Sequence, residues 1–308
     1  MNIVIYGAGG VGGYFGARLA EAGNNVTFIA RGSHLTTIQK KGLYLKSFKG
    51  DFLVSPANAT DDITKIEKID LILVCVKTWQ LKGAAKIFKE VISKNTMVIS
   101  LLNGVENQDI LYSELPKENV IGGLCKIVSF IEAPGVIKHN SYEPTIVFGE
   151  LNNIKTDRAL NLEQVLKNAK IKTVLANDIQ KEIWTKILFI STISALGALT
   201  RSSVGEMLEY PFIKNMMLSI SEEILEVAKA LGINLSDEVI ENQFKIIESQ
   251  PYKTTASLQR DMMERKPSEL EAQNGTIVRL GNELGVPTPT NDLVYFTLIP
   301  QEKRARKN

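Results

Sequence analysis

The sequence predicts an α/β domain built on a parallel sheet over residues 1–177, followed by an all-α domain over residues 178–308. In the first part, short apolar runs alternate with helical segments, which is typical of a parallel sheet covered by helices. From residue 178 onward the apolar residues recur with helical spacing instead. A chain of 308 residues is also long enough to form two separate cores.

A glycine-rich turn near the start of the chain lies between an apolar run, residues 2–6, and a helical segment, residues 13–22. It has the pattern G-x-G-x-x-G and consists of Gly7, Ala8, Gly9, Gly10, Val11 and Gly12. In dinucleotide-binding domains of the Rossmann type, the first glycine allows the tight turn and the second lets the backbone reach the pyrophosphate. The third lets the helix pack closely on the strand. The free N–H groups at the helix N-terminus then favour phosphate binding.

The surroundings of this turn make it more specific than the glycine pattern alone. A second predicted strand, residues 25–30, completes a βαβ unit of about 30 residues. The Gly-Lys-Ser/Thr of a P-loop does not follow the turn. The sequence therefore predicts a Rossmann-type dinucleotide-binding domain, with a nicotinamide cofactor favoured and a flavin as the open alternative.

The residue after the second strand bears on the choice of cofactor. This residue is Arg31, where NAD-preferring sites usually carry Asp or Glu to hold the ribose 2′-hydroxyl. A carboxylate repels a 2′-phosphate, whereas a guanidinium offers it a paired, charge-assisted contact. Arg31 therefore favours NADP(H) over NAD(H), with a solvated surface arginine as the alternative. Gly32, Ser33 and His34 offer further neutral donors, although a histidine beside a basic residue is more often only exposed.

The composition is that of a soluble globular protein, with 44% hydrophobic residues, 23% charged residues and a net charge of +2. It indicates no nucleic-acid or membrane partner, and we expect the basic tail, residues 303–307, to be solvated or frayed. We expect no secretory signal, and the longest apolar stretch, residues 187–199, is too short to span a bilayer. Cys75 and Cys125 lie in apolar runs and predict neither a metal site nor a disulfide. The expectation is a cytoplasmic enzyme without a metal, whose apolar helices leave room for a homodimer.

Two polar residues follow predicted parallel strands and are candidates for ligand binding. Lys77 follows the apolar run at residues 70–76, and Asn103 follows the run at residues 96–102. Ligands of open α/β sheets bind at the carboxyl ends of the strands, which is where both residues are expected. An Asn-Gly pair is also common in turns, and a lysine at a strand end is often only solvated, so both interpretations stay open.

The remaining elements are expected from periodicity and from turn residues. In the first domain we expect helices over residues 33–41, 81–92 and 156–168, paired strands over 43–54, short strands over 120–130, 135–138 and 145–150, and an edge strand over 172–175. In the second domain we expect helices over residues 179–199, 204–231, 237–249, 256–265, 269–284 and 291–302. Gly232 and Gly285 are expected to end helices, and Ser236 and Ser268 to cap them.

Spaced motifs link the glycine turn and Arg31 to the rest of the chain. They read Val76-Lys77-x-Trp79-Gln80, Leu102-Asn103-Gly104, Trp184-x-Lys186, Ser257-Leu258-Gln259-x-Asp261, Ser268-Glu269-Leu270-Glu271, Asn274-Gly275 and Leu284-Gly285-Val286-Pro287-Thr288-Pro289. In this order, and over almost the whole chain, the set resembles the ketopantoate reductase (2-dehydropantoate 2-reductase) family. The spaced set is far more specific than the glycine motif alone.

The resemblance implies an NADPH-dependent reduction of a small 2-oxo acid to a 2-hydroxy acid, with 2-dehydropantoate to (R)-pantoate, in pantothenate biosynthesis, as the leading reaction. By similarity, Lys186 is the general acid that protonates the carbonyl oxygen, and Glu269 lies near the substrate and the nicotinamide ribose. Ser257 binds the substrate carboxylate, and Asn103 contacts cofactor and substrate. Arg31 and Lys77 flank the adenosine phosphate end of the cofactor. A ketone that accepts hydride develops oxyanion charge, which an ammonium group can stabilise and protonate.

Two positions depart from the family pattern. Members with the pantoate activity typically carry asparagines four and eight residues after the lysine, on one face of the helix, where this chain has Ile190 and Ser194. Isoleucine cannot form a side-chain hydrogen bond, and serine offers one short hydroxyl in place of an amide. One alternative is therefore a paralogue that reduces a more hydrophobic 2-oxo acid or ketone. Another is a non-catalytic NADPH-binding sensor, which has no use for Lys186 and Glu269.

Overall fold

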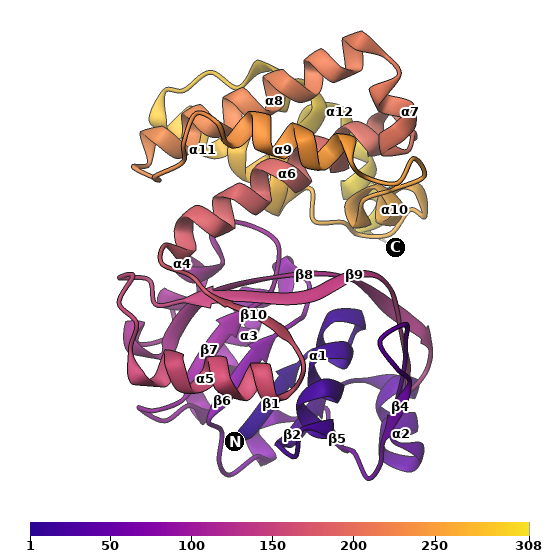
Figure 1. The fold of residues 1–308 in the computed structure, drawn as a ribbon, viewed down its shortest axis with the longest axis vertical. Helices are drawn as coiled ribbons and strands as arrows, with labels where there is room; N and C mark the ends of the chain where they lie inside the picture. The colour runs from indigo at the N-terminus through magenta and orange to yellow at the C-terminus, as the bar shows by residue number, and fades with distance from the viewer. Residues whose placement is uncertain (308) are drawn as a thin grey trace. The chain divides into compact units, whose positions relative to one another are not determined.

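The structure is a computed structural model that describes residues 1–307, and it divides into two compact units (Figure 1). The first unit comprises residues 1–102 and 106–179, and the second comprises residues 103–105 and those from 180 onward. The first unit is built on a parallel-rich sheet and the second consists of helices, so the predicted fold class is confirmed. Residues 103–105 pack with the helical unit although they follow a strand of the sheet.

The sheet of the first unit has ten strands among the described residues. They are β1 (Asn2–Tyr6), β2 (Asn25–Ile29), β3 (Leu43–Ser47), β4 (Phe52–Val54), β5 (Asn58–Thr60), β6 (Leu71–Val74), β7 (Met97–Ser100), β8 (Val120–Ala133), β9 (Val136–Gly149) and β10 (Lys172–Leu175). The helices of this unit are α1 (Gly10–Glu21), α2 (Gly32–Lys41), α3 (Leu81–Val91), α4 (Asn107–Tyr112) and α5 (Asp157–Asn168), with short 3₁₀ turns η1 (Ile63–Lys65), η2 (Thr78–Gln80) and η3 (Lys117–Asn119).

The strand order is β4-β3-β9-β8-β7-β6-β1-β2-β5, and β10 pairs with β9. All neighbours from β5 through β8 along this order are parallel, whereas β8 and β9 are antiparallel. Tyr6 at the end of β1 is in register with Ile29 of β2 and with Val74 of β6. The carboxyl ends of these three strands therefore lie at one edge of the sheet, and the segments that follow them share that edge.

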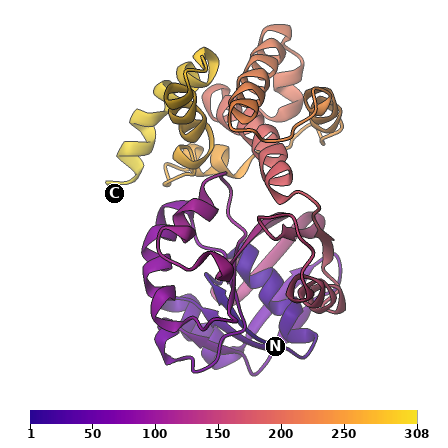
Figure 2. The ribbon, with the colours of Figure 1, turned by 90° about the vertical axis from the view of Figure 1, so that its left-hand side faces the viewer.

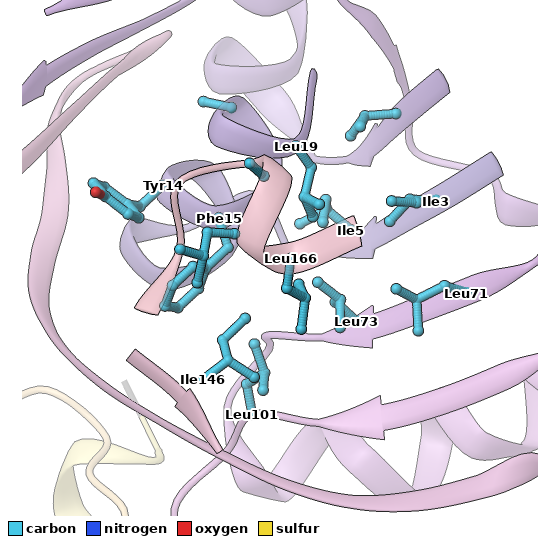
Figure 3. Packing of buried hydrophobic residues seen from close by; sticks show 14 of the residues in the cluster. Ile3, Ile5, Tyr14, Phe15, Leu19, Leu71, Leu73, Leu101, Ile146 and Leu166 are labelled. Atoms are coloured by element: carbon cyan, nitrogen blue, oxygen red, sulfur yellow. The ribbon is translucent and has the colours of Figure 1, made fainter. Parts of the chain in front are cut away.

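Side chains of the central strands alternate between two buried clusters, one on each face of the sheet. Ile3 and Ile5 of β1 belong to a cluster that includes Phe15 of α1 and residues of α5, part of which Figure 3 shows. Val4 of β1 belongs to the other cluster, which includes Phe88 of α3 and residues of α4. Helices therefore cover both faces, as Figure 2 shows. Burial of one such large apolar side chain contributes about 1.5–3 kcal/mol relative to exposure.

Three predictions for the first unit were incomplete. The short strands expected over residues 120–150 are two 14-residue strands, β8 and β9, that form one long antiparallel pair. Register shifts at residues 126–133 interrupt the alternation of side chains, so the sequence shows only fragments of it. Residues 58–60 form β5 beside β2, whereas the strands predicted in this region covered only residues 43–54. The helix α4 was not expected because it spans only six residues.

The second unit is helical from Gln180 onward in the part that the structure describes. Its elements are α6 (Ile179–Thr200), α7 (Val204–Leu208), α8 (Pro211–Ala230), α9 (Val239–Glu248), α10 (Ser257–Met263), the π-helical turn η4 (Glu271–Gly275), α11 (Thr276–Leu284) and α12 (Pro289–Ala305). The single helix predicted over 204–231 is two helices, because Pro211 begins α8 at its N-terminus. Gly285 ends α11 in the left-handed conformation, as expected. Ser236 was expected to cap the next helix, but the residue that flanks the N-terminus of α9 is Glu238.

The helix α6 runs through the second unit as its longest apolar element. Its 22 residues are long and apolar enough to cross a membrane by length and composition, so the sequence-based estimate, which counted only residues 187–199, was too short. In this structure 67% of its most apolar window is buried inside the protein. Such burial is what a core helix shows, and α6 carries the predicted catalytic lysine.

Candidate active site

The glycine turn connects β1 to α1 at the carboxyl edge of the sheet. Gly7 has a φ of +106°, a conformation that side-chain-bearing residues rarely adopt. A Cβ atom on Gly12 would lie 2.1 Å from the Gly7 carbonyl oxygen and 2.7 Å from Cγ2 of Ile5. The first and third glycines of the motif therefore have the steric roles that the sequence predicts: a tight turn and close packing of helix on strand.

The two glycines in the middle of the turn, Gly9 and Gly10, have different surroundings. A Cβ atom on Gly10 would lie 2.2 Å from the carbonyl oxygen of Ser129 in β8, so this glycine serves packing. A Cβ atom on Gly9 would meet no atom within 4 Å. Gly9 therefore faces open space, as expected of the residue whose backbone approaches the pyrophosphate.

The N-terminus of α1 fits an anionic group. No side chain caps it, and its first turn contains no acidic residue, so its N–H groups carry no competing carboxylate. Both backbone polar groups of the neighbouring Ala8 are hydrogen-bonded. Its N–H donates to Ile29 O at 3.0 Å, and its carbonyl oxygen contacts His34 Nε2 at 2.8 Å. A preformed turn with free N–H groups at a helix N-terminus is the arrangement that binds the phosphates of a dinucleotide. The residues present therefore fit the predicted cofactor.

Arg31 follows β2 directly and precedes α2, in extended backbone. Its side chain is exposed and has no ion-pair partner among residues 1–307. Its charge is felt at the end of β1: burial raises the pKa of the Tyr6 phenol, and the Arg31 guanidinium opposes that rise. Because β1 and β2 end at the same edge of the sheet, Arg31 follows the strand end where the residue that recognises the ribose 2′-position is expected.

His34 was expected to be only exposed, and the structure corrects this. The ring is half-buried and bridges two segments: Gly135 N–H donates to Nδ1 at 3.0 Å, so Nε2 carries the proton and donates to Ala8 O at 2.8 Å. Burial lowers the pKa of His34, and the bond to Ala8 opposes this. The neutral ring is therefore favoured at neutral pH, and the bond from Gly135 is lost as the pH falls through the lowered pKa. The sequence gives no sign of this role because the partners are backbone groups.

Lys77 lies at the same sheet edge, just after β6. The backbone that leads to it passes close to the glycine turn, since a Cβ atom on Gly7 would lie 2.9 Å from the carbonyl group of Cys75. Its Nζ atom lies 5.9 Å from the centre of the Trp79 ring, a cation–π distance, and its side chain is half-buried. A role of Lys77 beside the cofactor stays a prediction.

Asn103 and Glu269, two of the predicted site residues, contact each other directly through their side chains. Asn103 Nδ2 donates to Glu269 Oε2 at 2.9 Å, across 166 positions of sequence. Glu269 is 7% exposed, and it lies two residues before Glu271, the first residue of the π-helical turn η4. π-Helical turns are rare and often lie at functional sites. The structure therefore joins two residues that the sequence motifs placed together only by resemblance.

The other predicted substrate-binding residues lie on α6 and α10. Lys186 and Ile190 are half-buried on α6, one turn apart, and Ser194 one turn further is 2% exposed. Of the two departures from the family pattern, Ser194 is therefore buried inside the helical unit and Ile190 is half-buried. Ser257 is exposed as the first residue of α10, and its hydroxyl has no hydrogen-bond partner in the described part of the chain.

Comparison with known proteins identifies the family. A family model described as "Ketopantoate reductase PanE/ApbA" matches residues 3–153, and one described as "Ketopantoate reductase PanE/ApbA C terminal" matches residues 178–302. The chain belongs to the ketopantoate reductase family. It is an oxidoreductase of the class that acts on CH–OH groups, and the predicted cofactor, NADP(H), is the one that this family uses.

Three proteins that are similar to this chain over nearly its whole length carry different names. A Bacillus subtilis (strain 168) protein named "Uncharacterized oxidoreductase YkpB" is 30% identical over 298 residues, which are 97% of this chain and 98% of that protein. The crystal structure of a PanE/ApbA family ketopantoate reductase from Ralstonia eutropha JMP134 has a TM-score of 0.91 at 31% identity and covers 99% of this chain and 100% of that chain. A D-mandelate dehydrogenase with NADH and anilino(oxo)acetate has a TM-score of 0.91 at 25% identity, with the same coverage of both chains.

Proposed function

We propose that this ketopantoate reductase family member reduces a 2-oxo acid to the corresponding 2-hydroxy acid with NADPH, and that 2-dehydropantoate, which gives (R)-pantoate for pantothenate biosynthesis, is the leading substrate. The observation that carries the proposal is the Asn103–Glu269 hydrogen bond, because it joins two residues of separate family motifs. Cys75 and Cys125 form no disulfide in the described part of the chain, which agrees with a cytoplasmic location. The direct test is incubation with NADPH and 2-dehydropantoate and identification of pantoate by mass spectrometry.

Each group has a defined task in this reaction. When bound, the cofactor supplies the hydride that C2 of the substrate accepts. Lys186 then donates a proton from Nζ to the carbonyl oxygen, so that the C=O bond becomes CH–OH and the charge that develops on oxygen is neutralised. Glu269, held by Asn103, accepts a hydrogen bond from the substrate hydroxyl or from the lysine. The exposed Ser257 hydroxyl donates to the substrate carboxylate.

Arg31 is proposed to select NADPH over NADH. The variant Arg31→Ala is expected to raise KM for NADPH about 10- to 150-fold, because a hydrogen bond to a charged group contributes about 1.5–3 kcal/mol. KM for NADH is expected to stay within about twofold, since NADH lacks the 2′-phosphate. Lys40→Ala, at the other end of α2, is the matched control for a lost surface cation. Equal effects of Arg31→Ala on both cofactors would refute this role.

A second candidate function is the reduction of a more hydrophobic 2-oxo acid. Ile190 and Ser194 favour it, because on α6 they replace amides by a half-buried apolar group and a buried short hydroxyl. The similarity to a D-mandelate dehydrogenase points the same way, since mandelate is an aromatic 2-hydroxy acid. On this alternative the same catalytic groups act, and only the substrate side chain differs.

The double variant Ile190→Asn/Ser194→Asn separates these candidates. If the natural substrate is more hydrophobic, kcat/KM for 2-dehydropantoate is expected to rise about 2- to 10-fold for each hydrogen bond gained, at about 0.5–1.5 kcal/mol each. Activity with branched or aromatic 2-oxo acids is expected to fall. Ile190→Leu keeps the position apolar and serves as the control, and the melting temperature reports whether the buried end of α6 accommodates the larger amide of Ser194→Asn. No gain in a folded double variant would count against the hydrophobic substrate.

A further inference from the structure

Glu302 near the C-terminal end of α12 is buried against the residue that precedes Glu269. It is 1% exposed, and its carboxylate accepts hydrogen bonds from groups of Ser268 and Arg306. Ser268 donates its N–H at 2.9 Å and its hydroxyl at 2.6 Å, both to Oε2. Arg306 donates from Nε to Oε1 at 2.6 Å. A buried carboxylate with this many donors is held in one orientation, and it holds the donors in turn.

Arg306 also binds Ser268 directly, in addition to its contact with Glu302. Its Nη2 donates to the Ser268 carbonyl oxygen at 3.0 Å, so both backbone polar groups of Ser268 are bound by side chains from the C-terminal end of the chain. The sequence predicted a solvated or frayed tail over residues 303–307, which is wrong for Arg306. We call Glu302, Arg306 and Ser268 the C-terminal clamp.

The residues after Glu269 are anchored as well. Asn274, in η4, donates from Nδ2 to Asn291 Oδ1 at 3.0 Å, and Asn291 Nδ2 donates to Glu223 Oε2 at 2.7 Å. Asn274 and Asn291 are fully buried. Glu269 therefore lies between two polar anchors, of which the C-terminal clamp is adjacent to it in sequence.

We propose that Glu302 is a positioning residue for Glu269: with Arg306 it fixes the backbone of Ser268 and so aims the Glu269 carboxylate at Asn103 and at the reacting groups. This inference rests on the proposed function, in which Glu269 contacts substrate and cofactor. Glu302 itself does not contact the predicted catalytic groups. Its effect is expected in turnover, because a displacement of about 1 Å at a reacting group can cost 10²-fold in rate.

A double-mutant cycle tests this role. Glu302→Gln removes the charge that holds Arg306 and places an amide N–H₂ against the donors of Ser268, and it is expected to lower kcat about 10- to 100-fold. KM for NADPH is expected to change less than kcat, because the glycine turn proposed to hold the phosphates belongs to the first unit and is not altered by the substitution. In a Glu269→Gln background, the same substitution is expected to change kcat less than about twofold. An equal fall in both backgrounds would show that Glu302 does not act through Glu269 and would overturn the proposal.

Two further variants serve as the control and as a substitute in this test. Glu283→Gln removes an exposed i,i+4 partner of Arg279 on α11 and is the matched control, expected to leave kcat unchanged within about twofold. Ser268→Ala removes the hydroxyl contact with Glu302 and the hydrogen bond that this hydroxyl accepts from Leu270 N–H, but it keeps the backbone contact with Glu302. It is expected to lower kcat less than Glu302→Gln does. It replaces Glu302→Gln in the cycle if that variant fails to fold.

Hydrogen exchange measured by mass spectrometry tests the clamp without any substrate. Glu302→Gln is expected to increase amide exchange in peptides that cover residues 266–276, whereas Glu283→Gln leaves them unchanged. Unchanged exchange in Glu302→Gln would overturn the proposal. If the unmutated protein oxidises NADPH with none of the 2-oxo acids offered, the proposed function fails, and the exchange result alone decides whether the clamp fixes this segment.

Discussion

Lys186→Met is expected to lower kcat for 2-oxo acid reduction about 10²- to 10⁴-fold, the usual contribution of a positioned general acid. Methionine keeps an unbranched chain of similar length on α6 but carries neither charge nor proton. The half-buried position of Lys186 makes this exchange tolerable for packing. The dissociation constant of NADPH, measured by its fluorescence on binding, is expected to stay within about twofold. Turnover lost with cofactor binding retained is the signature of an enzyme rather than of an NADPH sensor.

Lys181→Met is the matched control for this prediction. Lys181 lies on the same helix, is also half-buried, and is five residues away, on a different side of α6 from Lys186. Its replacement is expected to change kcat less than about threefold, the change that an altered local charge gives. If Lys186→Met retained kcat within about tenfold of the unmutated protein, another group would have to supply the proton, and the assignment of Lys186 would fail.

Gly12→Ala is expected to have the largest effect on folding. Its Cβ would lie 2.1 Å from a backbone oxygen of the glycine turn, and backbone cannot rotate away as a flexible side chain can. Overpacking of this kind costs about 1–3 kcal/mol or more, so the melting temperature is expected to fall by several degrees and NADPH binding to weaken with it.

Gly9→Ala is compared with Gly12→Ala in order to separate an effect on cofactor binding from an effect on folding. Its Cβ meets nothing within 4 Å and its backbone has an allowed φ of −71°, so the melting temperature without cofactor is expected to stay unchanged. NADPH binding is expected to weaken about tenfold or more, because the added methyl group would occupy the space of the pyrophosphate, and about 1.4 kcal/mol is already a factor of ten. Unweakened binding in a folded Gly9→Ala variant would contradict the placement of the pyrophosphate at this turn.

The parts of the fold that the sequence predicts best are those governed by local rules. The glycine turn follows from steric requirements of single residues, and α3 follows from the spacing of Leu81, Ala84, Ala85 and Phe88, all of which are buried. The long pair of β8 and β9 was only partly predicted, because irregular register breaks the period of two. The break between α7 and α8 could have been predicted from Pro211, since proline usually begins a helix rather than lying within one.

The contacts that support the candidate site were less predictable. The Asn103–Glu269 bond joins positions 166 residues apart, and only the resemblance to a family placed them together. The roles of His34 and Arg306 depend on backbone carbonyl and N–H groups, which leave no trace in side-chain patterns. The burial of Glu302 could not be predicted either, since a glutamate near a basic helix end is usually an exposed member of an i,i+4 pair.

The central claim, reduction of a 2-oxo acid by NADPH, is tested most directly by spectrophotometric measurement of NADPH oxidation by the purified protein. The substrates are 2-dehydropantoate and a small panel of branched and aromatic 2-oxo acids, each repeated with NADH. The account predicts rapid, NADPH-selective turnover of 2-dehydropantoate or of a more hydrophobic acid on the panel. NADPH binding without oxidation by any acid on the panel would contradict it and would favour a non-catalytic NADPH sensor.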